Sequence, residues 1–332
     1  MKKILVTGGA GYIGSHTIVE LDKAGYMPII VDNLCNSSLS NITGIEEITT
    51  KKVKWYDVDC SDIISMKKIF NIEKSIIAVI HFAAFKSVEE SVKNPDKYHK
   101  NNVGSLEVLI KCMNENNVQQ IIFSSSCTVY GSPNVLPVEE NAEFKKAESP
   151  YGQTKQICEK LLLKQGLNSI SLRYFNPIGS HSSCLIGDCS TDKASNLVPI
   201  MTEHAIGKRK EIIVFGNDYD TQDGTCVRDY IHVIDLAQAH VSALNFILTN
   251  SGKYAFNIGT GKGISVLDAI NSFEKTNEIK LNYRIGKRRS GDIAEIYSNN
   301  SLAQNKLKWE AKKSLEEAMK SAWEWEVKKS KV

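Results

Sequence analysis

The sequence of 332 residues has no long apolar run and no strong excess of charge of either sign. Its longest apolar stretch, residues 76–85, contains His81 and is too short to cross a bilayer. Lys and Arg together number 41 against 38 Asp and Glu, which gives no reason to expect a nucleic acid or a membrane as a partner. A hydrophobic content of 42% and a charged content of 24% are typical of globular proteins and exclude a disordered chain.

The sequence also lacks paired cysteines, because its eight cysteines are scattered and none belongs to a C-x-x-C motif. Scattered thiols are typical of a reducing compartment, and the segment before the first apolar stretch is too short for a signal peptide, so we expect a cytoplasmic location. His181, Cys184 and Cys189 lie close in sequence but have no evident fourth ligand. No metal site is therefore predicted.

Glycine is concentrated near the N-terminus, directly after a short apolar stretch at residues 3–6. Gly8, Gly11 and Gly14 recur every three residues, Gly9 adds the spacing G-x-G-x-x-G, and a helical pattern follows. A residue without Cβ permits a sharp turn and lets backbone N–H groups approach a pyrophosphate at a helix N-terminus. This stretch predicts a strand, a turn and a helix that bind the phosphates of a dinucleotide.

A second apolar stretch, residues 27–31, ends in Asp32 at the distance expected for a dinucleotide-binding unit. A carboxylate at the tip of this strand accepts hydrogen bonds from both hydroxyls of the adenosine ribose and repels a 2′-phosphate. NAD is therefore predicted rather than NADP. The alternative interpretation is an ordinary glycine turn followed by a solvated Asp32.

Further strands are predicted at residues 53–59, 77–82 and 120–126, alternating with helices at 61–70, capped by Ser61, and 95–116. This alternation predicts an α/β fold with a doubly wound parallel sheet of the Rossmann type. From residue 176 the alternation becomes irregular. We expect an NAD-binding domain at residues 1–175 and a smaller, mixed lobe for the substrate at 176–332, some segments of which return to the first domain.

Ser149 and Pro150 predict the start of a helix on which Tyr151 and Lys155 share a face. An ammonium beside a phenol lowers the phenol pKa from about 10 toward neutrality. Such a phenol can take a proton from a sugar hydroxyl while the carbon below gives hydride to a nicotinamide. A second pair, Tyr283 and Lys287, has the same spacing, but it lies in a predicted strand that would hold the two groups roughly 13 Å apart.

These motifs resemble the extended short-chain dehydrogenase/reductase family. The matching segments are residues 8–16, 32–37, 81–83, 124–131 and 151–155. Further segments narrow the resemblance to the nucleotide-sugar 4-epimerases of that family over essentially the whole chain; these are residues 173–181, 214–219, 223–233, 289–292, 307–309 and 323–325.

The resemblance implies an NAD-dependent isomerase with a UDP-sugar as substrate. Tyr151 would deprotonate the 4-hydroxyl while C4 passes hydride to NAD+, and hydride would return to the opposite face of the 4-keto sugar. Lys155 would hold the nicotinamide ribose, and Ser126 would hydrogen-bond the reacting oxygen. The implied reaction interconverts UDP-galactose and UDP-glucose, a step of galactose metabolism.

The resemblance also assigns contacts to both ligands by position. Those to NAD are Gly8, Gly11, Tyr12, Ile13, Gly14, Asp32, Asn33, Leu34, Cys35, Asn36, Ser37, Asp59, Cys60, Phe82, Ala83, Ala84, Phe85, Lys86, Asn101, Ser126, Tyr151, Lys155 and Phe175. Those to the UDP-sugar are Ser126, Tyr151, Asn176, Asn196, Leu197, Ile213, Val214, Phe215, Arg228, Arg289, Asp292 and Ile296.

Arg228 and Arg289 would clamp the substrate diphosphate through charge-assisted hydrogen bonds. The alternative is that they form surface ion pairs with Asp229 and Asp292. Ile296 lies at a position that is bulky in family members restricted to UDP-glucose and small in those that also accept N-acetylated sugars, and its own size is intermediate. The resemblance further implies a homodimer formed through the helices at residues 95–116 and 151–165.

Three other functions are considered. The size of Ile296 is compatible with a related 4-epimerase that acts also on UDP-N-acetylhexosamines. A nucleotide-sugar dehydratase would need an acid and a carboxylate where this chain has Cys127 and Thr128. A non-catalytic, NAD-sensing regulator need not keep Tyr151 and Lys155.

The segment 187–195 departs from the family's usual proline-rich sequence, which weakens only the assignments around the uridine.

Overall fold

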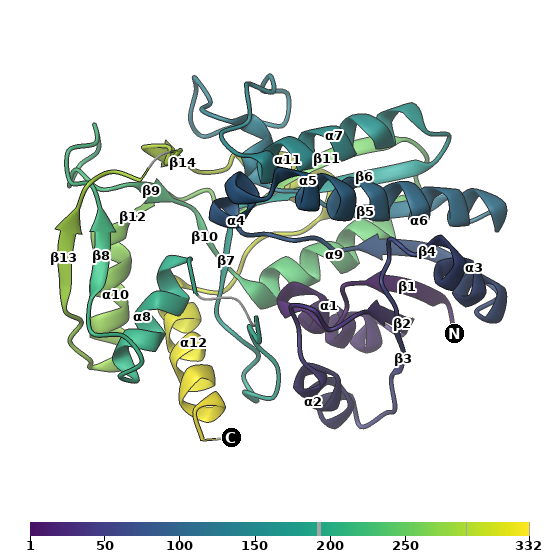
Figure 1. Ribbon diagram of the computed structural model, residues 1–332, viewed down its shortest axis with the longest axis horizontal. Coiled ribbons are helices and arrows are strands. Elements are labelled where there is room, and N and C mark those ends of the chain that lie inside the picture. Colours follow the sequence, from purple (N-terminus) through teal and green to yellow (C-terminus); the bar gives the residue numbers. More distant parts are fainter. Residues whose placement is uncertain (191–193, 290, 332) are drawn as a thin grey trace.

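The computed structural model describes residues 1–190, 194–289 and 291–331. Ser290, within the motif 289–292, and residues 191–193, within the segment 187–195, lie outside the described residues. The chain forms a larger lobe built on one extended sheet and a smaller lobe of short strands and helices (Figure 1).

Seven parallel strands form the sheet of the larger lobe, in the order β11-β6-β5-β4-β1-β2-β3. The predicted parallel, doubly wound α/β fold is therefore confirmed. The strands are β1 (Lys3–Thr7), β2 (Met27–Asp32), β3 (Lys54–Asp57), β4 (Ile76–His81), β5 (Gln120–Ser124), β6 (Asn168–Tyr174) and β11 (Lys253–Ile258).

Helices cover both faces of this sheet. The side chains of β1 alternate between the two faces, since Ile4 and Val6 pack into one core cluster and Leu5 into the other. Burial on both faces explains why residues 3–6 are continuously apolar. The first cluster includes α1 (Tyr12–Lys23), α2 (Leu39–Thr49), α9 (Val233–Ile247) and α11 (Ser301–Leu307), and the second includes α3 (Ile63–Ile72), α6 (Gly104–Glu115) and α7 (Pro150–Lys164).

Three elements from the second half of the chain lie in the larger lobe. β11 pairs with β6 at one edge of the sheet, and α9 and α11 pack on the face that α1 also covers. The larger lobe is thus built from three separate parts of the sequence, which are the N-terminal part that ends with β6, the segment that carries α9 and β11, and the segment that carries α11.

Within the described residues, the smaller lobe consists of short strands and three helices around its own apolar core, which includes Met201, Phe273 and Met319. β9 (Val227–Arg228) lies between β12 (Ile264–Ser265) and β14 (Glu295–Ile296). The other strand pairs are β7 (Asn176–Ile178) with β10 (Tyr230–His232) and β8 (Ile212–Phe215) with β13 (Tyr283–Gly286), and the helices are α8 (Leu197–Ala205), α10 (Val266–Asn277) and α12 (Leu315–Lys329).

The structure corrects two predicted helices. α3 begins at Ile63 and is capped by Asp62, whose carboxylate accepts from the Ile64 backbone N–H, whereas the Ser61 hydroxyl donates to Asp59. The helix predicted at residues 95–116 contains a π-helical stretch and is assigned in three parts. They are α5 (Pro95–Tyr98), the π-helix η1 (His99–Val103) and α6, and they follow α4 (Val88–Lys93).

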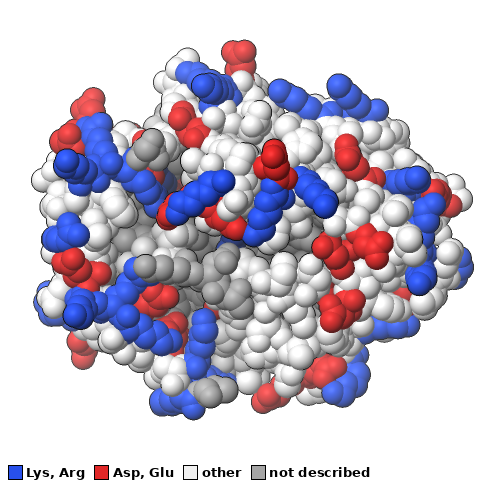
Figure 2. All heavy atoms as spheres, viewed as in Figure 1, with Lys and Arg blue, Asp and Glu red and all other residues white. Residues whose placement is uncertain are grey.

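Side chains of both signs are interspersed on the face of the molecule seen in Figure 2. Ion pairs on the surface of the protein include Lys67 with Glu115 at 2.8 Å and Lys93 with Glu89 at 2.6 Å. Within the described ranges, none of the helices combines the length and the apolar character that a membrane crossing requires.

Candidate active site

The carboxyl ends of the parallel strands meet at one edge of the sheet, where the glycine turn follows β1. Gly8 has a φ of +69°, which L side chains rarely adopt, and a Cβ on Gly14 would lie 2.2 Å from the Gly8 carbonyl oxygen. Both positions therefore require glycine. α1 begins after Gly11 without a side-chain cap, so its first N–H groups are suited to binding an anion.

Asp32, at the end of β2, is buried and hydrogen-bonded, so the alternative of a solvated Asp32 is wrong. Its Oδ2 accepts from the Ala10 backbone N–H at 3.0 Å. Its Oδ1 accepts from the Leu34 backbone N–H and from the Ser37 hydroxyl, both at 2.9 Å. The carboxylate thus joins the glycine turn to the loop after β2, and three donors leave it the capacity to accept a further hydrogen bond.

The other residues predicted to contact NAD follow the same strand ends. Among them the Cys60 thiol is buried, and burial raises its pKa, so it stays protonated at neutral pH. The remaining positions are Tyr12 and Ile13 in the first turn of α1, Asn33, Cys35 and Asn36 after β2, Asp59 after β3, Phe82, Ala83, Ala84, Phe85 and Lys86 after β4, Asn101 on η1, and Phe175 between β6 and β7.

Residues 187–190 lie against this edge and contact two of the predicted NAD-binding residues. The Asp188 carboxylate pairs with the Lys86 ammonium at 3.4 Å, and the Ser190 hydroxyl donates to Asn36 Oδ1 at 2.7 Å. Behind them, the Trp325 indole N–H donates to the Asp188 carbonyl at 3.4 Å. Sequence reasoning missed Asp188, because no motif marks it and 102 residues separate it from Lys86.

Tyr151 and Lys155 lie one turn apart on α7, which begins as predicted. The Ser149 side chain accepts from the Gly152 backbone N–H at 3.1 Å, and Pro150 is the first residue of the helix. Lys155 is 3% exposed and Tyr151 is 8% exposed. The Lys155 ammonium donates to the Ser124 carbonyl at 2.7 Å and lies 5.7 Å from the centre of the Tyr151 ring. The structure therefore brings the predicted pair together at the end of β5.

Ser126 lies beside this pair. It follows β5 and caps the short 3-10 helix η2 (Cys127–Tyr130), where its Oγ accepts from the Thr128 backbone N–H at 3.3 Å. Its hydroxyl also works to lower the pKa of the Tyr151 phenol. The three residues predicted to act on the reacting hydroxyl thus form one cluster.

Burial determines the protonation of the Tyr151 and Lys155 side chains. It raises the pKa of the Tyr151 phenol above its usual value, despite the opposing effect of Ser126. It lowers the pKa of Lys155 to about 8. The prediction that Lys155 brings the phenol pKa toward neutrality is therefore wrong for the protein chain alone, because desolvation of the phenolate outweighs the nearby ammonium.

The second pair with this spacing, Tyr283 and Lys287, is not part of the cluster. Tyr283 begins β13 in the smaller lobe and is 46% exposed. Lys287 follows the last residue of that strand. The prediction that these two residues belong to a strand and its end, rather than to a helix, is confirmed.

Arg228 and Arg289 approach the same carboxylate in the smaller lobe. The Arg289 guanidinium pairs with Asp292 at 2.8 Å, as the ion-pair alternative expected, and Arg228 lies 3.9 Å from the same carboxylate. Asp229, the other expected partner, is fully buried and instead accepts hydrogen bonds from Thr260 and Ser298. Asp292 thus holds two guanidinium groups near each other, an arrangement suited to a doubly charged ligand such as a diphosphate.

The other residues predicted to bind the substrate are distributed between the lobes. Phe215 is exposed at the end of β8, and the Arg289 guanidinium lies 5.4 Å from its ring centre. Val214 packs its side chain into the core of the smaller lobe, so only its backbone is suited to contact a ligand. The remaining positions are Asn176 in β7, Asn196 and Leu197 at the start of α8, Ile213 in β8 and Ile296 in β14.

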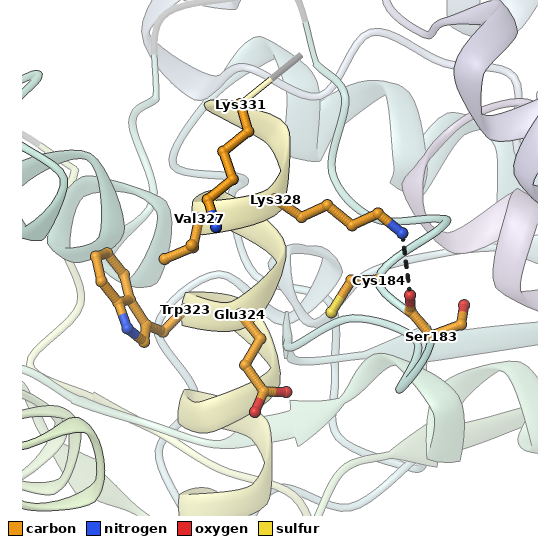
Figure 3. Close-up of a pocket in the computed structure, with 7 residues that line it drawn as sticks. All are labelled: Ser183, Cys184, Trp323, Glu324, Val327, Lys328 and Lys331. Atoms are coloured by element: carbon orange, nitrogen blue, oxygen red, sulfur yellow. Dashed lines mark hydrogen bonds between the residues drawn. The ribbon is translucent and has the colours of Figure 1, made fainter.

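A hollow of about 490 Å³ lies between α12 and the segment that carries Ser183 and Cys184, and its lining includes none of the predicted site residues (Figure 3). Trp323 and Val327 form part of its wall, and Lys328 donates to the Ser183 carbonyl at 3.3 Å. Cys184 also lines it, but the described residues contain no group of three or more His, Cys, Asp or Glu that could hold a metal ion.

Comparison with known proteins agrees with this arrangement. Residues 4–259 match the NAD dependent epimerase/dehydratase family. The chain is 47% identical over 328 residues to the UDP-glucose 4-epimerase of Haemophilus influenzae, with 97% of each chain covered, and 46% identical to that of Bacillus subtilis, with 97% of this chain and 96% of the relative covered.

Solved structures show the same similarity. A UDP-glucose 4-epimerase from Stenotrophomonas maltophila, with bound NAD and formylated UDP-arabinopyranose, has a TM-score of 0.97 at 43% identity, covering 100% of this chain and 99% of the other. A second, from Bifidobacterium longum in complex with NAD+ and UDP, has a TM-score of 0.95 at 43% identity, covering 99% of both chains. The fold, the site and these similarities together show that the chain belongs to the NAD dependent epimerase/dehydratase family.

Proposed function

We propose that this protein interconverts UDP-galactose and UDP-glucose with tightly held NAD+. The observation that carries the proposal is the cluster of Tyr151, Lys155 and Ser126 at the end of β5, on the same sheet edge as the glycine turn and Asp32. It stands in a chain that is similar over nearly its full length to UDP-glucose 4-epimerases.

In this proposal Tyr151 takes the proton of the sugar 4-hydroxyl and later returns it. Bound NAD+ would supply a site that accepts hydride from C4 and gives it back. It would also supply a positive charge, which stabilises the Tyr151 phenolate. Lys155 adds its own positive charge and is held toward the Tyr151 ring by the Ser124 carbonyl. Ser126 donates to the reacting oxygen, which carries negative charge as the proton leaves.

The proposed reaction changes only the configuration at C4. The hydride and the proton would leave together to give a 4-keto sugar. Both would return to it after the sugar has turned its opposite face toward the nicotinamide site. No external oxidant or reductant is consumed. Arg228 and Arg289 would hold the diphosphate throughout, so that the sugar can turn while the nucleotide stays bound.

The direct test is to incubate the purified protein with UDP-galactose, without added reductant, and to identify the products by chromatography. We expect UDP-glucose, at a ratio to UDP-galactose that is the same when the reaction starts from either sugar. Loss of water from the sugar would instead indicate a dehydratase, and no product at all would indicate a non-catalytic NAD-binding protein.

The environment of the η2 helix argues against the dehydratase. Cys127, where such an enzyme needs an acid or carboxylate, is 9% exposed, and burial raises the pKa of its thiol to about 12. The group therefore stays neutral at physiological pH and is a poor proton donor.

For the diphosphate clamp we expect Arg289→Gln to raise KM for UDP-galactose by about 10-fold or more, because a charge-assisted hydrogen bond contributes about 1.5–3 kcal/mol. The value of kcat should change little, since the diphosphate lies away from the reacting carbon. Arg284→Gln is the matched control, because Arg284 pairs with Glu211 on the surface of β13 at 2.8 Å. Equal KM values for the two variants would show that Arg289 does not bind the diphosphate.

For the sugar specificity we propose at least weak activity on UDP-N-acetylglucosamine. Ile296 is 3% exposed and packs in one cluster with Cys127 and Phe175, so its side chain restricts the space near the reacting groups without closing it as an aromatic ring would. Ile296→Ala should increase turnover of the N-acetylated sugar relative to UDP-glucose. The same change at Ile270, in the core of the smaller lobe, should not. Absence of detectable product by chromatography with the wild-type protein would contradict this proposal.

We also propose a homodimer and a cytoplasmic location. α6 and α7 share a surface hollow of about 430 Å³ that Ile110 and Leu161 help to line, which is compatible with a partner helix packing there. Light scattering should give twice the 36.9 kDa of one chain. The described residues include all eight cysteines and contain no disulfide bond between them, a state that a reducing compartment favours.

A further inference from the structure

A buried ion pair lies directly behind the cluster of Tyr151, Lys155 and Ser126. Glu159 of α7 and Arg173 of β6 are 4% and 6% exposed. The Arg173 Nη2 donates to Glu159 Oε2 at 2.7 Å, and its Nε donates to Glu159 Oε1 at 3.0 Å, so the pair is bidentate. No contact in the proposed mechanism uses either residue.

The same carboxylate also holds the end of β5. The Ser125 hydroxyl, which is fully buried, donates to Glu159 Oε1 at 2.5 Å. Ser125 lies between Ser124, whose carbonyl accepts from Lys155, and Ser126. A single carboxylate therefore fixes the short segment that both orients the ammonium and presents the Ser126 hydroxyl.

Glu159 is placed on α7 so that it continues the face of Tyr151 and Lys155. The three residues are spaced i, i+4 and i+8, which puts their side chains on one side of a helix. Arg173 extends the connection to the end of β6, because it precedes Tyr174, whose hydroxyl contacts the Ser124 hydroxyl. The ion pair thus joins α7 and β5, which position the groups of the proposed reaction, to the neighbouring strand β6.

Arg173 is in turn held from the far side. Its Nη1 donates to the Tyr130 hydroxyl at 3.0 Å and to the Glu140 carbonyl at 2.8 Å. Tyr130 donates onward to Asn257 Oδ1, in β11, at 2.6 Å. The guanidinium therefore has little freedom to move, and the carboxylate it binds is fixed as well.

A gain in folding stability does not account for such a buried ion pair. Removing two charges from water costs about as much as their mutual attraction returns, so a buried ion pair usually adds little net stability over apolar residues of the same size. What the pair provides is geometry. A displacement of about 1 Å between reacting groups lowers a rate by about 100-fold.

We propose that Glu159, held by Arg173, is a positioning residue that sets Ser126 and Lys155 relative to Tyr151. This inference rests on the proposed function, because it assigns these residues a part in the same reaction. It predicts that loosening the connection lowers kcat without weakening the binding of the UDP-sugar, whose diphosphate would be held in the other lobe.

The first test is Ser125→Ala, which cuts the connection from Glu159 to β5 and leaves the ion pair intact. We expect kcat to fall about 10-fold, with KM for UDP-galactose, NAD content and unfolding temperature close to those of the wild type. Ser171→Ala is the matched control, because Ser171 is a buried serine in the neighbouring strand β6. It should leave kcat unchanged.

The second test replaces both charges, in the double variant Glu159→Leu with Arg173→Met. Exchanging the whole pair avoids a lone buried charge, which would unfold the protein for reasons unrelated to the reaction. We expect a folded protein with a kcat about 100-fold lower and an unchanged KM. A wild-type kcat in Ser125→Ala overturns the inference, as does a wild-type kcat in the folded double variant. An inactive wild type in the same assay would instead refute the proposed function.

Discussion

Replacing Tyr151 with phenylalanine should lower kcat for UDP-galactose by about 100-fold to 10,000-fold, the usual contribution of a positioned acid or base. The change removes only one hydroxyl from a residue that is 8% exposed, so the fold should be retained. Bound NAD should also be retained, because the glycine turn and Asp32 are untouched. The measurements are kcat by chromatography and the NAD released from the denatured protein.

The sequence provides a matched control for this change. Tyr283→Phe alters the other tyrosine that has a lysine four residues on, but Tyr283 lies exposed at the start of β13. Its kcat should equal that of the wild type. If Tyr151→Phe kept more than a tenth of the activity, the phenol would not be the base, and the proposed mechanism would have to be abandoned.

Gly14→Ala should yield a protein without bound NAD and without activity. The added Cβ would lie 2.2 Å from the Gly8 carbonyl oxygen and 2.8 Å from Gly9 Cα, both of them backbone atoms that cannot rotate away. α1 must then move away from the turn, which displaces the N–H groups expected to bind the pyrophosphate. The measurement is the absorbance of NAD released from the purified variant, together with its unfolding temperature.

Gly104→Ala is the control for that prediction. Gly104 also lies in a helix of the larger lobe, at the start of α6, but apart from its chain neighbours and the backbone of its own helix no atom would lie within 4 Å of a Cβ there. This variant should bind NAD and react normally. A Gly14→Ala protein with a full complement of NAD would show that α1 does not contribute to the phosphate site.

The parts of the site that could be predicted are those whose chemistry is local in sequence. A strand, a glycine turn and a helix follow one another within the first 23 residues. The spacing of the glycines indicates where the backbone must approach itself closely, as Gly14 does Gly8. The cap at Ser149 and the shared face of Tyr151 and Lys155 are equally local. Each depends on contacts between residues at most six apart in the sequence.

The parts that could not be predicted depend on distant contacts. Asp188 meets Lys86, and Glu159 meets both Ser125 and Arg173, only because the sheet and its helices bring them together. The pKa of Tyr151 belongs to the same class, since it depends on how completely the fold removes the phenol from water. The four-residue spacing of Tyr151 and Lys155 shows that the two side chains share a helix face, but it does not show how deeply they are buried.

The position of β11 has a consequence for how the protein is made. β6 pairs on one side with β5 and on the other with β11, which ends at Ile258. While the ribosome is still translating the intervening 80 or so residues, the growing chain has an unpaired strand edge and an apolar sheet face that only α1 and α2 cover, because α9 and α11 are also still to come. The nascent protein is therefore exposed to aggregation until late in its synthesis, and fragments that stop near residue 175 should be insoluble.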